Sequence, residues 1–347
     1  MENFAFIVHL RAIEDIAYTI PFIPKWIITK LLRRPILWLM WKLYGRLGFM
    51  VRSSFKVNNN IKGHIVLIWL TGHQMIAPNH NGSVRKRILE AILFAQNRLN
   101  CGVVGLGALT ASVTSGGRWV AEHPEITCAI THGDHHATGL AIEGIEKLAK
   151  EKFGSTLSNL TLNLIGATGI IGDALSRALT PLTGKLILTG RKKSKLAKYS
   201  NLPNVEISDD ITDAITADIV VTATSWPDAL IKPEHLKKGA IVYEVSQPRN
   251  VSPQVAEKRK DILIVDGSYA RVPENINFWW MSLPHHHTFG CMAETIMQCL
   301  EGDPNHHVGS IDLSFLEEVK RRAQKYGFTH ADFTSFNTPI LISRENV

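Results

Sequence analysis

The sequence lacks acidic residues over one long stretch. Between Ile16 and Leu89 there is no Asp or Glu, although the 347-residue chain contains 31 of them. The same stretch holds twelve Lys and Arg, which exceeds the net charge of +7, so the remainder of the chain is net acidic. A positive field confined to one region predicts an acidic partner, and an anionic membrane, an acidic protein and nucleic acid all meet that description.

Cysteine is also scarce. The four cysteines are Cys101, Cys128, Cys291 and Cys299, and none forms a CxxC pair. That spacing is typical neither of a zinc site nor of a disulfide framework, so we expect a reducing compartment, the cytoplasm. A basic start followed by a short apolar run and a cleavage site is missing as well, so we expect no secretory signal.

The basic region lacks a long apolar run. Within residues 20–51 the longest uncharged run is Pro35–Trp41, far below the ~18 apolar residues that span a bilayer. The region is nevertheless rich in Trp, Leu and Ile, and we expect Pro35 to break or kink a helix between its two groups of basic residues. Two interpretations of residues 20–55 stay open: an amphipathic helix pair in a membrane interface, giving a peripheral membrane contact, or a core-packing helix with a solvated basic face.

Apolar runs and turn residues predict the remaining elements. Before residue 150 we expect strands at 5–10 and 62–72, helices at 11–20 and 82–100, strand-to-loop passages at 101–112 and 126–139, and a helix at 139–154. From Leu160, six short strands alternate with helical segments, which indicates a parallel sheet with crossover helices. The six strands are expected at 161–166, 185–190, 205–208, 219–224, 240–245 and 262–267, and helices follow at 287–302 and 314–327.

The predicted fold class is therefore α/β. A Rossmann-like parallel-sheet domain at 151–280 follows an N-terminal α/β substrate domain at 1–150. The C-terminal helices, at 281–347, return to that first domain. No repeat interrupts this organisation.

A glycine-rich loop follows the first strand of the parallel sheet. In LIGATGIIGDAL, Gly166, Gly169 and Gly172 stand between a strand and a helix, together with Thr168, Ile170 and Ile171. Small residues let the backbone approach a pyrophosphate, and the helix N-terminus offers free N–H groups. The context predicts a dinucleotide site, and the alternative is a tight turn without a ligand.

The next strand end distinguishes between nicotinamide cofactors. An NAD site usually has an acidic residue there, whereas this chain has Arg191, Lys192 and Lys193. A guanidinium binds phosphate in bidentate fashion, so NADPH is the expected cofactor, against a solvated basic turn. Further along, Thr222, Ala223 and Thr224 end the fourth strand, at the edge where the cofactor lies in such sheets.

Cys291 is the candidate nucleophile. If a helix begins near His287–Thr288, the cysteine lies in its first turn, where the helix dipole favours the thiolate. His285, His286 and His287 precede it and are candidate proton acceptors. A thiolate beside a nicotinamide can form a thioester that hydride reduces to an aldehyde. The alternative is a small buried residue, which is how we interpret the other three cysteines.

A second group of histidines lies in HGDHHATG, residues 132–139. His132 and His136 are four apart, but the segment precedes its expected helix and a third ligand is missing, so we predict no metal site. A substrate-pocket role for His136 and a core role stay open.

Several motifs, in order, resemble the long-chain acyl-[acyl-carrier-protein] reductases known from cyanobacteria. They are AFIVHLRAIEDI, GLGALTAS, HGDHHATG, IGATGIIG, VYEVSQPRN, DGSY, TFGCMAET and YGF. The resemblance implies NADPH-dependent reduction of a fatty acyl thioester to an aldehyde, with Cys291 acylated and His136 on a family histidine. The chain departs from the family in His285–His287, in Ile170 where an Asp is usual, and in the basic, aromatic residues 20–55.

The resemblance leaves the acyl carrier open between acyl carrier protein and coenzyme A, and we expect no nucleic-acid partner. Two other hypotheses remain. One is an NADP oxidoreductase similar to shikimate dehydrogenase or glutamyl-tRNA reductase, for which a Lys–Asp pair or an N-terminal nucleophilic cysteine is not evident. The other is a membrane-associated NADPH-binding protein without catalysis.

Overall fold

The computed structural model describes residues 3–11, 13, 15, 27, 31–276 and 283–342, without the side chains of residues 41 and 43–47. Most of the helix expected at 11–20, and residues 20–26 and 28–30 of the basic segment, therefore lie outside the described residues. The chain folds into two compact units. The first contains Met1–Gly133, Val272–Gly309 and Lys325–Gly327, and the second contains Asp134–Arg271, Ser310–Gln324 and Phe328–Val347.

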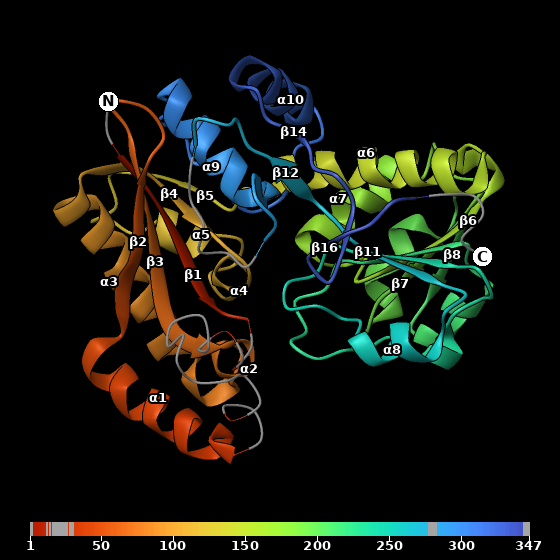
Figure 1. Cartoon of the computed structure of the whole chain (residues 1–347), viewed down its shortest axis with the longest axis horizontal. Coiled ribbons are helices and arrows are strands. Elements are labelled where there is room, and N and C mark those ends of the chain that lie inside the picture. The colour runs from red at the N-terminus through yellow and green to blue at the C-terminus, as the bar shows by residue number, and fades with distance from the viewer. Residues whose placement is uncertain are drawn as a thin grey trace. The chain divides into compact units, whose positions relative to one another are not determined.

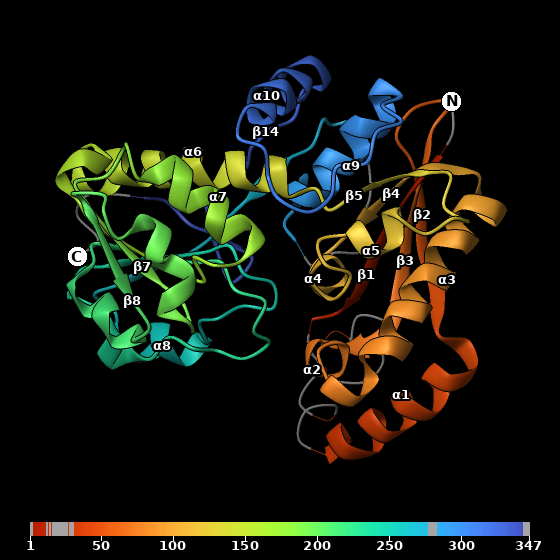
Figure 2. The same ribbon diagram turned by 180° about the vertical axis from the view of Figure 1, so that it is seen from behind.

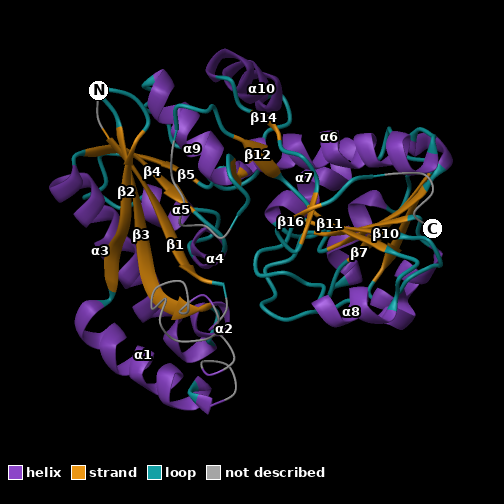
Figure 3. Cartoon of the chain, viewed as in Figure 1, coloured by secondary structure: helices purple, strands orange, loops and turns teal. Residues whose placement is uncertain are grey.

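The first unit is built on a five-stranded sheet in the order β2-β3-β1-β4-β5. Parallel pairing joins β3, β1, β4 and β5, while β2 runs antiparallel along the edge. Figure 3 separates its helices from its strands by colour. The elements are β1 (Asn3–Leu10), α1 (Arg33–Leu47), β2 (Phe49–Lys56), β3 (Lys62–Thr71), α2 (Gly72–Met75), α3 (Asn81–Leu99), β4 (Cys101–Leu106), α4 (Leu109–Val113), α5 (Arg118–Ala121), β5 (Ala129–Thr131), β13 (His287–Phe289) and α9 (Gly290–Glu301).

Strand alternation gives this sheet two different faces. On β1, Ala5 and Ile7 join the core cluster that contains the apolar residues of α3. Phe6 points the other way, and it would contact a side chain added at Gly105, as would Thr295 of α9. The C-terminal helix α9 thus packs on the sheet of the first unit, as the sequence predicted, beside β4 in Figure 1. The later helix at Phe315–Tyr326 differs from the prediction, because it belongs to the second unit as far as Gln324, where Phe315 packs on His135.

The expected break at Pro35 is wrong. Pro35 stands third in α1, in the first turn, where proline needs no hydrogen-bond partner for its missing N–H. It therefore belongs to the beginning of a 15-residue helix and does not interrupt one.

The second unit contains a six-stranded parallel sheet in the order β11-β10-β9-β6-β7-β8, and all six predicted strands are confirmed. Numbered along the chain, that order is the 3-2-1-4-5-6 of a Rossmann fold. Its elements are α6 (Asp134–Phe153), β6 (Thr161–Ile165), α7 (Ile170–Leu179), β7 (Lys185–Thr189), the 3-10 helix η5 (Lys193–Tyr199), β8 (Val205–Ser208), β9 (Ile219–Thr222), β10 (Ile241–Glu244), α8 (Pro253–Lys258), β11 (Leu263–Asp266), β12 (Tyr269–Arg271), α10 (Phe315–Tyr326), β14 (Thr329–His330), β15 (Thr334–Ser335) and β16 (Thr338–Pro339). The helix α10 belongs to this unit as far as Gln324.

Helices cover both faces of the parallel sheet. Leu164 and Val221 pack in one cluster with apolar residues of α6 and α7, whereas Ile165 and Val220 pack in another with Val255 of α8. The helices α6 and α7 lie side by side in both views (Figures 1 and 2). Two-sided burial explains why inner strands such as β9 are continuous apolar runs, whereas the edge strand β8 is partly exposed.

The helix α6 differs from its prediction. It begins at Asp134, five residues before the expected start at Gly139, so His135 and His136 lie in its first turn. Its apolar residues, such as Ile145, belong to the core of the second unit. The compact units consequently divide after Gly133, whereas the sequence suggested a boundary near residue 150.

Candidate functional site

The glycine loop lies at the point where the strand order of the Rossmann sheet reverses, between β6 and β9. Gly166 has a φ of +93°, and a Cβ there would lie 2.5 Å from the Ala223 carbonyl oxygen. A Cβ on Gly172 would lie 2.0 Å from the Gly166 carbonyl oxygen. Both positions therefore require glycine, because the loop, the end of β9 and α7 meet without room for a side chain.

The opposite side of the loop is open. Thr168 and Gly169 are exposed, and Gly169 directly precedes α7 as its N-cap residue. The first N–H groups of a ten-residue helix thus border a surface formed by small residues. This cradle fits the pyrophosphate of a dinucleotide.

The end of β7 continues this surface. The Thr168 methyl carbon would lie 3.1 Å from a Cβ on Gly190, so the loop reaches the residue that precedes Arg191. Arg191 and Lys192 are exposed, and η5 follows them. Tyr199 of η5 donates a 3.0 Å hydrogen bond to Asp173 of α7, and this bond anchors the basic turn from behind.

Glu244, at the end of β10, organises the neighbouring strand ends. Its Oε1 accepts hydrogen bonds from the Thr222 hydroxyl and, at 3.0 Å, from the Ser246 N–H. Its Oε2 accepts from the backbone N–H groups of Asn250 at 2.7 Å and Val251 at 3.0 Å. Burial raises the pKa of this carboxyl to about 7, although its hydrogen bonds favour the charged form.

The same network reaches Thr224, which the sequence predicted at the cofactor edge. The Thr224 N–H donates to Ser246 Oγ at 2.9 Å, and its hydroxyl donates to Asn250 Oδ1 at 2.6 Å. The structure thus brings together Gly166, Ala223 and Thr224 around one end of the sheet.

Cys291 is the second residue of α9, which begins at Gly290 directly after β13. The helix thus begins slightly later than expected, and the cysteine still lies in its first turn. Of the four cysteines, Cys101, Cys128 and Cys299 are buried, and Cys291 is partly exposed. A thiol at the positive end of a 12-residue helix is in the position that favours its thiolate.

The first turn of α9 packs tightly on the end of β5. Gly133 has a φ of +69°, and a Cβ there would lie 2.4 Å from the Cys291 Cα. The Gly133 N–H donates to Thr131 Oγ1 at 3.0 Å, and Thr131 in turn donates to Glu294 Oε1 at 3.3 Å. These contacts hold the backbone of Cys291 in place.

The two predicted histidines lie in different units. His287 is buried in β13, and its Nδ1 lies 3.0 Å from the carbonyl oxygen of His285. With Nδ1 as the donor, Nε2 is left as the proton acceptor, in the same unit as Cys291. His136 is buried in α6, which belongs to the second unit. The glycine loop belongs to the same unit.

Sequence reasoning missed Glu244 and the pair Thr131–Glu294. A carboxyl group inside the apolar strand 240–245 was an available signal, since a buried Glu needs several partners. For Thr131 and Glu294 the contact joins residues 163 positions apart, which no local pattern indicates.

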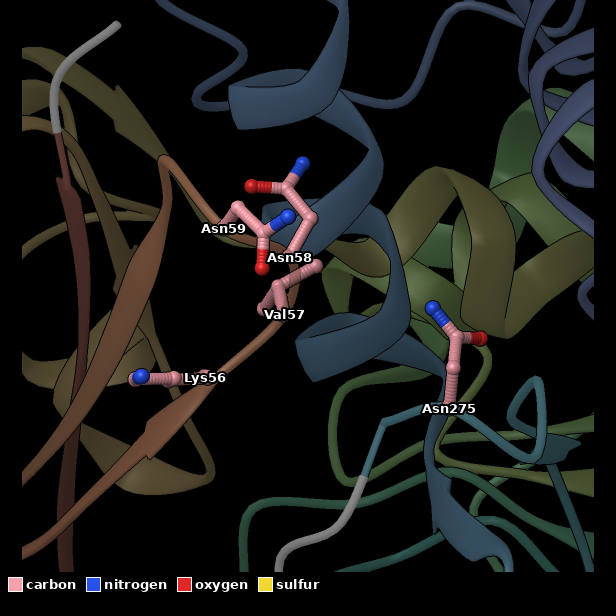
Figure 4. A pocket seen from close by; sticks show the side chains of 5 residues that line it. All are labelled: Lys56, Val57, Asn58, Asn59 and Asn275. Atoms are coloured by element: carbon pink, nitrogen blue, oxygen red, sulfur yellow. The ribbon is translucent and has the colours of Figure 1, made fainter.

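A shallow hollow lies elsewhere in the first unit, lined by Lys56, Val57, Asn58, Asn59 and Asn275 (Figure 4). The Asn58 side chain accepts from the N–H groups of Asn60 and Ile61, at 2.8 Å each. It therefore closes the turn between β2 and β3. None of the predicted site residues lines this hollow.

The chain is similar to known proteins in two ways, through a family model over its parallel-sheet region and through longer matches to individual proteins. Residues 147–266 match the family model described as shikimate / quinate 5-dehydrogenase. Over 272 residues the chain is 25% identical to a long-chain acyl-[acyl-carrier-protein] reductase of Synechococcus elongatus, covering 74% of this chain and 79% of that protein. A very-long-chain aldehyde decarbonylase GL1-2 of Oryza sativa is 22% identical over 82% of this chain, and the match spans 46% of that protein, less than half its length.

Among solved structures, an L-tryptophan dehydrogenase from Nostoc punctiforme is 12% identical, with a TM-score of 0.39, over 94% of this chain and 80% of that one. A score this low adds nothing to the strand order seen here. The family match and that strand order make the second unit an NAD(P)-binding Rossmann domain, and the chain an oxidoreductase that is distantly similar to acyl-[acyl-carrier-protein] reductase.

Proposed function

We propose that this protein uses NADPH to reduce a long-chain acyl thioester to a fatty aldehyde through an acyl group on Cys291. The observation that carries the proposal is the partly exposed thiol in the first turn of α9, in a chain that also contains an NAD(P)-binding domain. The similarity to an acyl-[acyl-carrier-protein] reductase supports the substrate class. The proposed carrier is acyl carrier protein or coenzyme A, and both are anionic.

The first step needs only the chain's own residues. The Cys291 thiolate attacks the thioester carbonyl, a carbon–sulfur bond to the enzyme forms, and the bond to the carrier sulfur breaks. The carrier thiolate leaves and takes up a proton. Nε2 of His287, four residues before the cysteine, is the proposed acceptor of the thiol proton, and His136 is the proposed substrate-pocket histidine.

The second half of the reaction needs two electrons. Bound NADPH would supply them as hydride to the acyl carbon, which releases the aldehyde and returns the cysteine as thiolate. One thioester, one NADPH and one proton thus give one aldehyde, one carrier thiol and one NADP⁺. Two groups of residues are expected to hold the cofactor. The glycine loop contributes Gly166, Thr168, Gly169, Ile170, Ile171 and Gly172. The ends of later strands contribute Arg191, Lys192, Thr222, Ala223 and Thr224.

Each unit has a proposed role. The second unit binds NADPH, with Arg191 and Lys192 facing the 2′-phosphate because both are exposed after β7. The first unit receives the acyl group and supplies Cys291. The proposed location is the cytoplasm, where thiols stay reduced.

Aldehyde formation by purified variants tests the proposal. Wild type incubated with palmitoyl-carrier thioester and NADPH should release palmitaldehyde, and NADH should support the reaction much less well. Cys291→Ser should release none, since its hydroxyl is far less ionised at neutral pH. Cys299→Ser is the matched control, because Cys299 is buried on the same helix and should keep substantial activity. Aldehyde release by Cys291→Ser near the wild-type rate would rule out the covalent route.

A second candidate is favoured by one observation, the family match over residues 147–266. It is a dehydrogenase that oxidises a hydroxyl group of a small polar ring acid. Shikimate- or quinate-dependent reduction of NADP⁺ by wild type, retained in Cys291→Ser, would favour that candidate, because no cysteine takes part in direct hydride transfer.

A further inference from the structure

The helix α1 turns apolar side chains toward solvent. Trp38 and Leu39 are 63% and 45% exposed, and Leu31, just before the helix, is 65% exposed. Lys42 stands one turn after Trp38 on the same face, whereas Met40, on the opposite face, is buried. This helix thus presents apolar side chains to solvent in addition to its apolar buried face, unlike a helix whose outer face is made for water.

The charges around this face are all of one sign. Arg33, Arg34 and Lys42 are exposed on α1, and the surrounding stretch from Ile16 to Leu89 contains no acidic residue. The Lys42 ammonium lies 5.0 Å from the centre of the Trp38 ring, so the cation and the aromatic ring are presented together. An indole beside ammonium and guanidinium groups matches the boundary between lipid tails and anionic headgroups.

The position of the helix suits such a contact. It packs on β3 of the first unit, and in both views it lies across one end of β2 and β3 (Figures 1 and 2). Within the described parts of the chain, no helix is long and apolar enough to cross a bilayer. A membrane contact here would therefore be interfacial.

We propose that α1, with Leu31, Trp38 and Leu39 as its anchors, docks the protein on an anionic lipid surface. Arg34 and Lys42 then bind lipid phosphates, while the apolar side chains enter the headgroup region. The contact depends only on α1 and does not rest on the chemistry proposed for Cys291. A membrane is favoured over an acidic protein because Trp38, Leu39 and Leu31 are the most exposed apolar side chains of this region, and lipid buries such a set without a shaped partner.

Vesicle sedimentation tests the proposal with the full chain. Wild type should sediment with vesicles of equal parts phosphatidylcholine and phosphatidylglycerol, stay in solution with pure phosphatidylcholine, and be largely released by 0.5 M NaCl. Trp38→Glu should weaken binding by roughly tenfold or more, because it removes an anchor and adds a repelled charge. The matched control is Ile215→Glu, since Ile215 is 52% exposed in the second unit and should leave binding unchanged.

A second pair of variants distinguishes loss of lipid binding from loss of folding. Lys42→Glu should weaken binding to the anionic vesicles, whereas Lys238→Glu, an exposed residue of the second unit, should not. Circular dichroism should show that all four variants fold as wild type does. Wild type that ignores the anionic vesicles, or variants that lose binding regardless of which unit they alter, would overturn the proposal. Binding of an acidic carrier protein that Trp38→Glu abolishes, without any vesicle binding, would overturn it in favour of a protein partner.

Discussion

Glu244 shows how burial and hydrogen bonding oppose each other at one residue. Its carboxyl is 1% exposed, and burial raises its pKa to about 7 from an ordinary value near 4.5. The protonated acid suits the site, because the Thr222 hydroxyl can rotate to accept the acid proton. The N–H groups of Asn250 and Val251 then keep Oε2 as their acceptor. The neutral form therefore keeps the strand ends joined.

The sign of the resulting pH dependence follows from the raised pKa. The folded state binds the proton more tightly than the unfolded state does, so the unfolding free energy falls as pH rises from about 4.5 to about 7. A shift of this size corresponds to about 3 kcal/mol when it is complete. Acidic conditions down to pH 5 should therefore strengthen this part of the second unit.

Glu244→Gln tests this behaviour. The amide copies the protonated acid but leaves the Ser246 N–H facing an NH₂ group, so at pH 5 it should cost about 1–3 kcal/mol. Urea unfolding measures the free energy of unfolding at pH 5 and pH 8. The difference in this free energy between wild type and variant should be smaller at pH 8. Glu206→Gln is the control, because Glu206 is half-exposed. The difference in unfolding free energy between wild type and this variant should be the same at both pH values. A gap that widens toward pH 8 would mean that the ionised carboxyl is the stable form.

At the scale of single elements, the first turn of α9 depends on Gly133. Its positive φ and the 2.4 Å between an added Cβ and the Cys291 Cα mean that alanine can fit only if the helix start moves. Gly133→Ala should therefore lower the unfolding free energy by roughly 2 kcal/mol or more and slow acylation of Cys291. Thermal unfolding and the rate of acyl transfer measure both effects.

Gly139, six residues along in α6, supplies the control for this change. Nothing lies within 4 Å of a Cβ added there, so Gly139→Ala should stabilise the helix by about 0.5–1 kcal/mol and leave acylation unchanged. Equal acylation rates in the two variants would contradict a positioning role for Gly133.

The elements also show which features a sequence can and cannot predict. Most of the strands from β6 to β11 were predictable because they are short apolar runs buried on both faces, and the exception is the partly exposed edge strand β8. The start of α6 was misplaced because His135 and His136 suggested a loop, although they occupy a helical turn. Pro35 was misread because a proline in the first turn of a helix and one in its middle look alike without the preceding boundary.

At the scale of the whole molecule, the proposed chemistry divides between two units. The glycine loop between β6 and α7 was predictable because its residues are local in sequence. The setting of Cys291 was not, because Gly133, Thr131 and Glu294 come from distant segments. The family match covers only the nucleotide-binding portion, residues 147–266. The central claim about the substrate consequently depends on Cys291.

An intact-protein mass spectrum tests that claim most directly. Wild type incubated with palmitoyl-coenzyme A, without NADPH, should gain the mass of one palmitoyl group, and peptide mapping should place it on Cys291. Adding NADPH should remove the acyl group as the aldehyde, and Cys291→Ser should gain no stable adduct while Cys299→Ser gains one. Wild type that stays unmodified with coenzyme A and acyl-carrier thioesters alike, or an adduct on any other residue, would contradict the account.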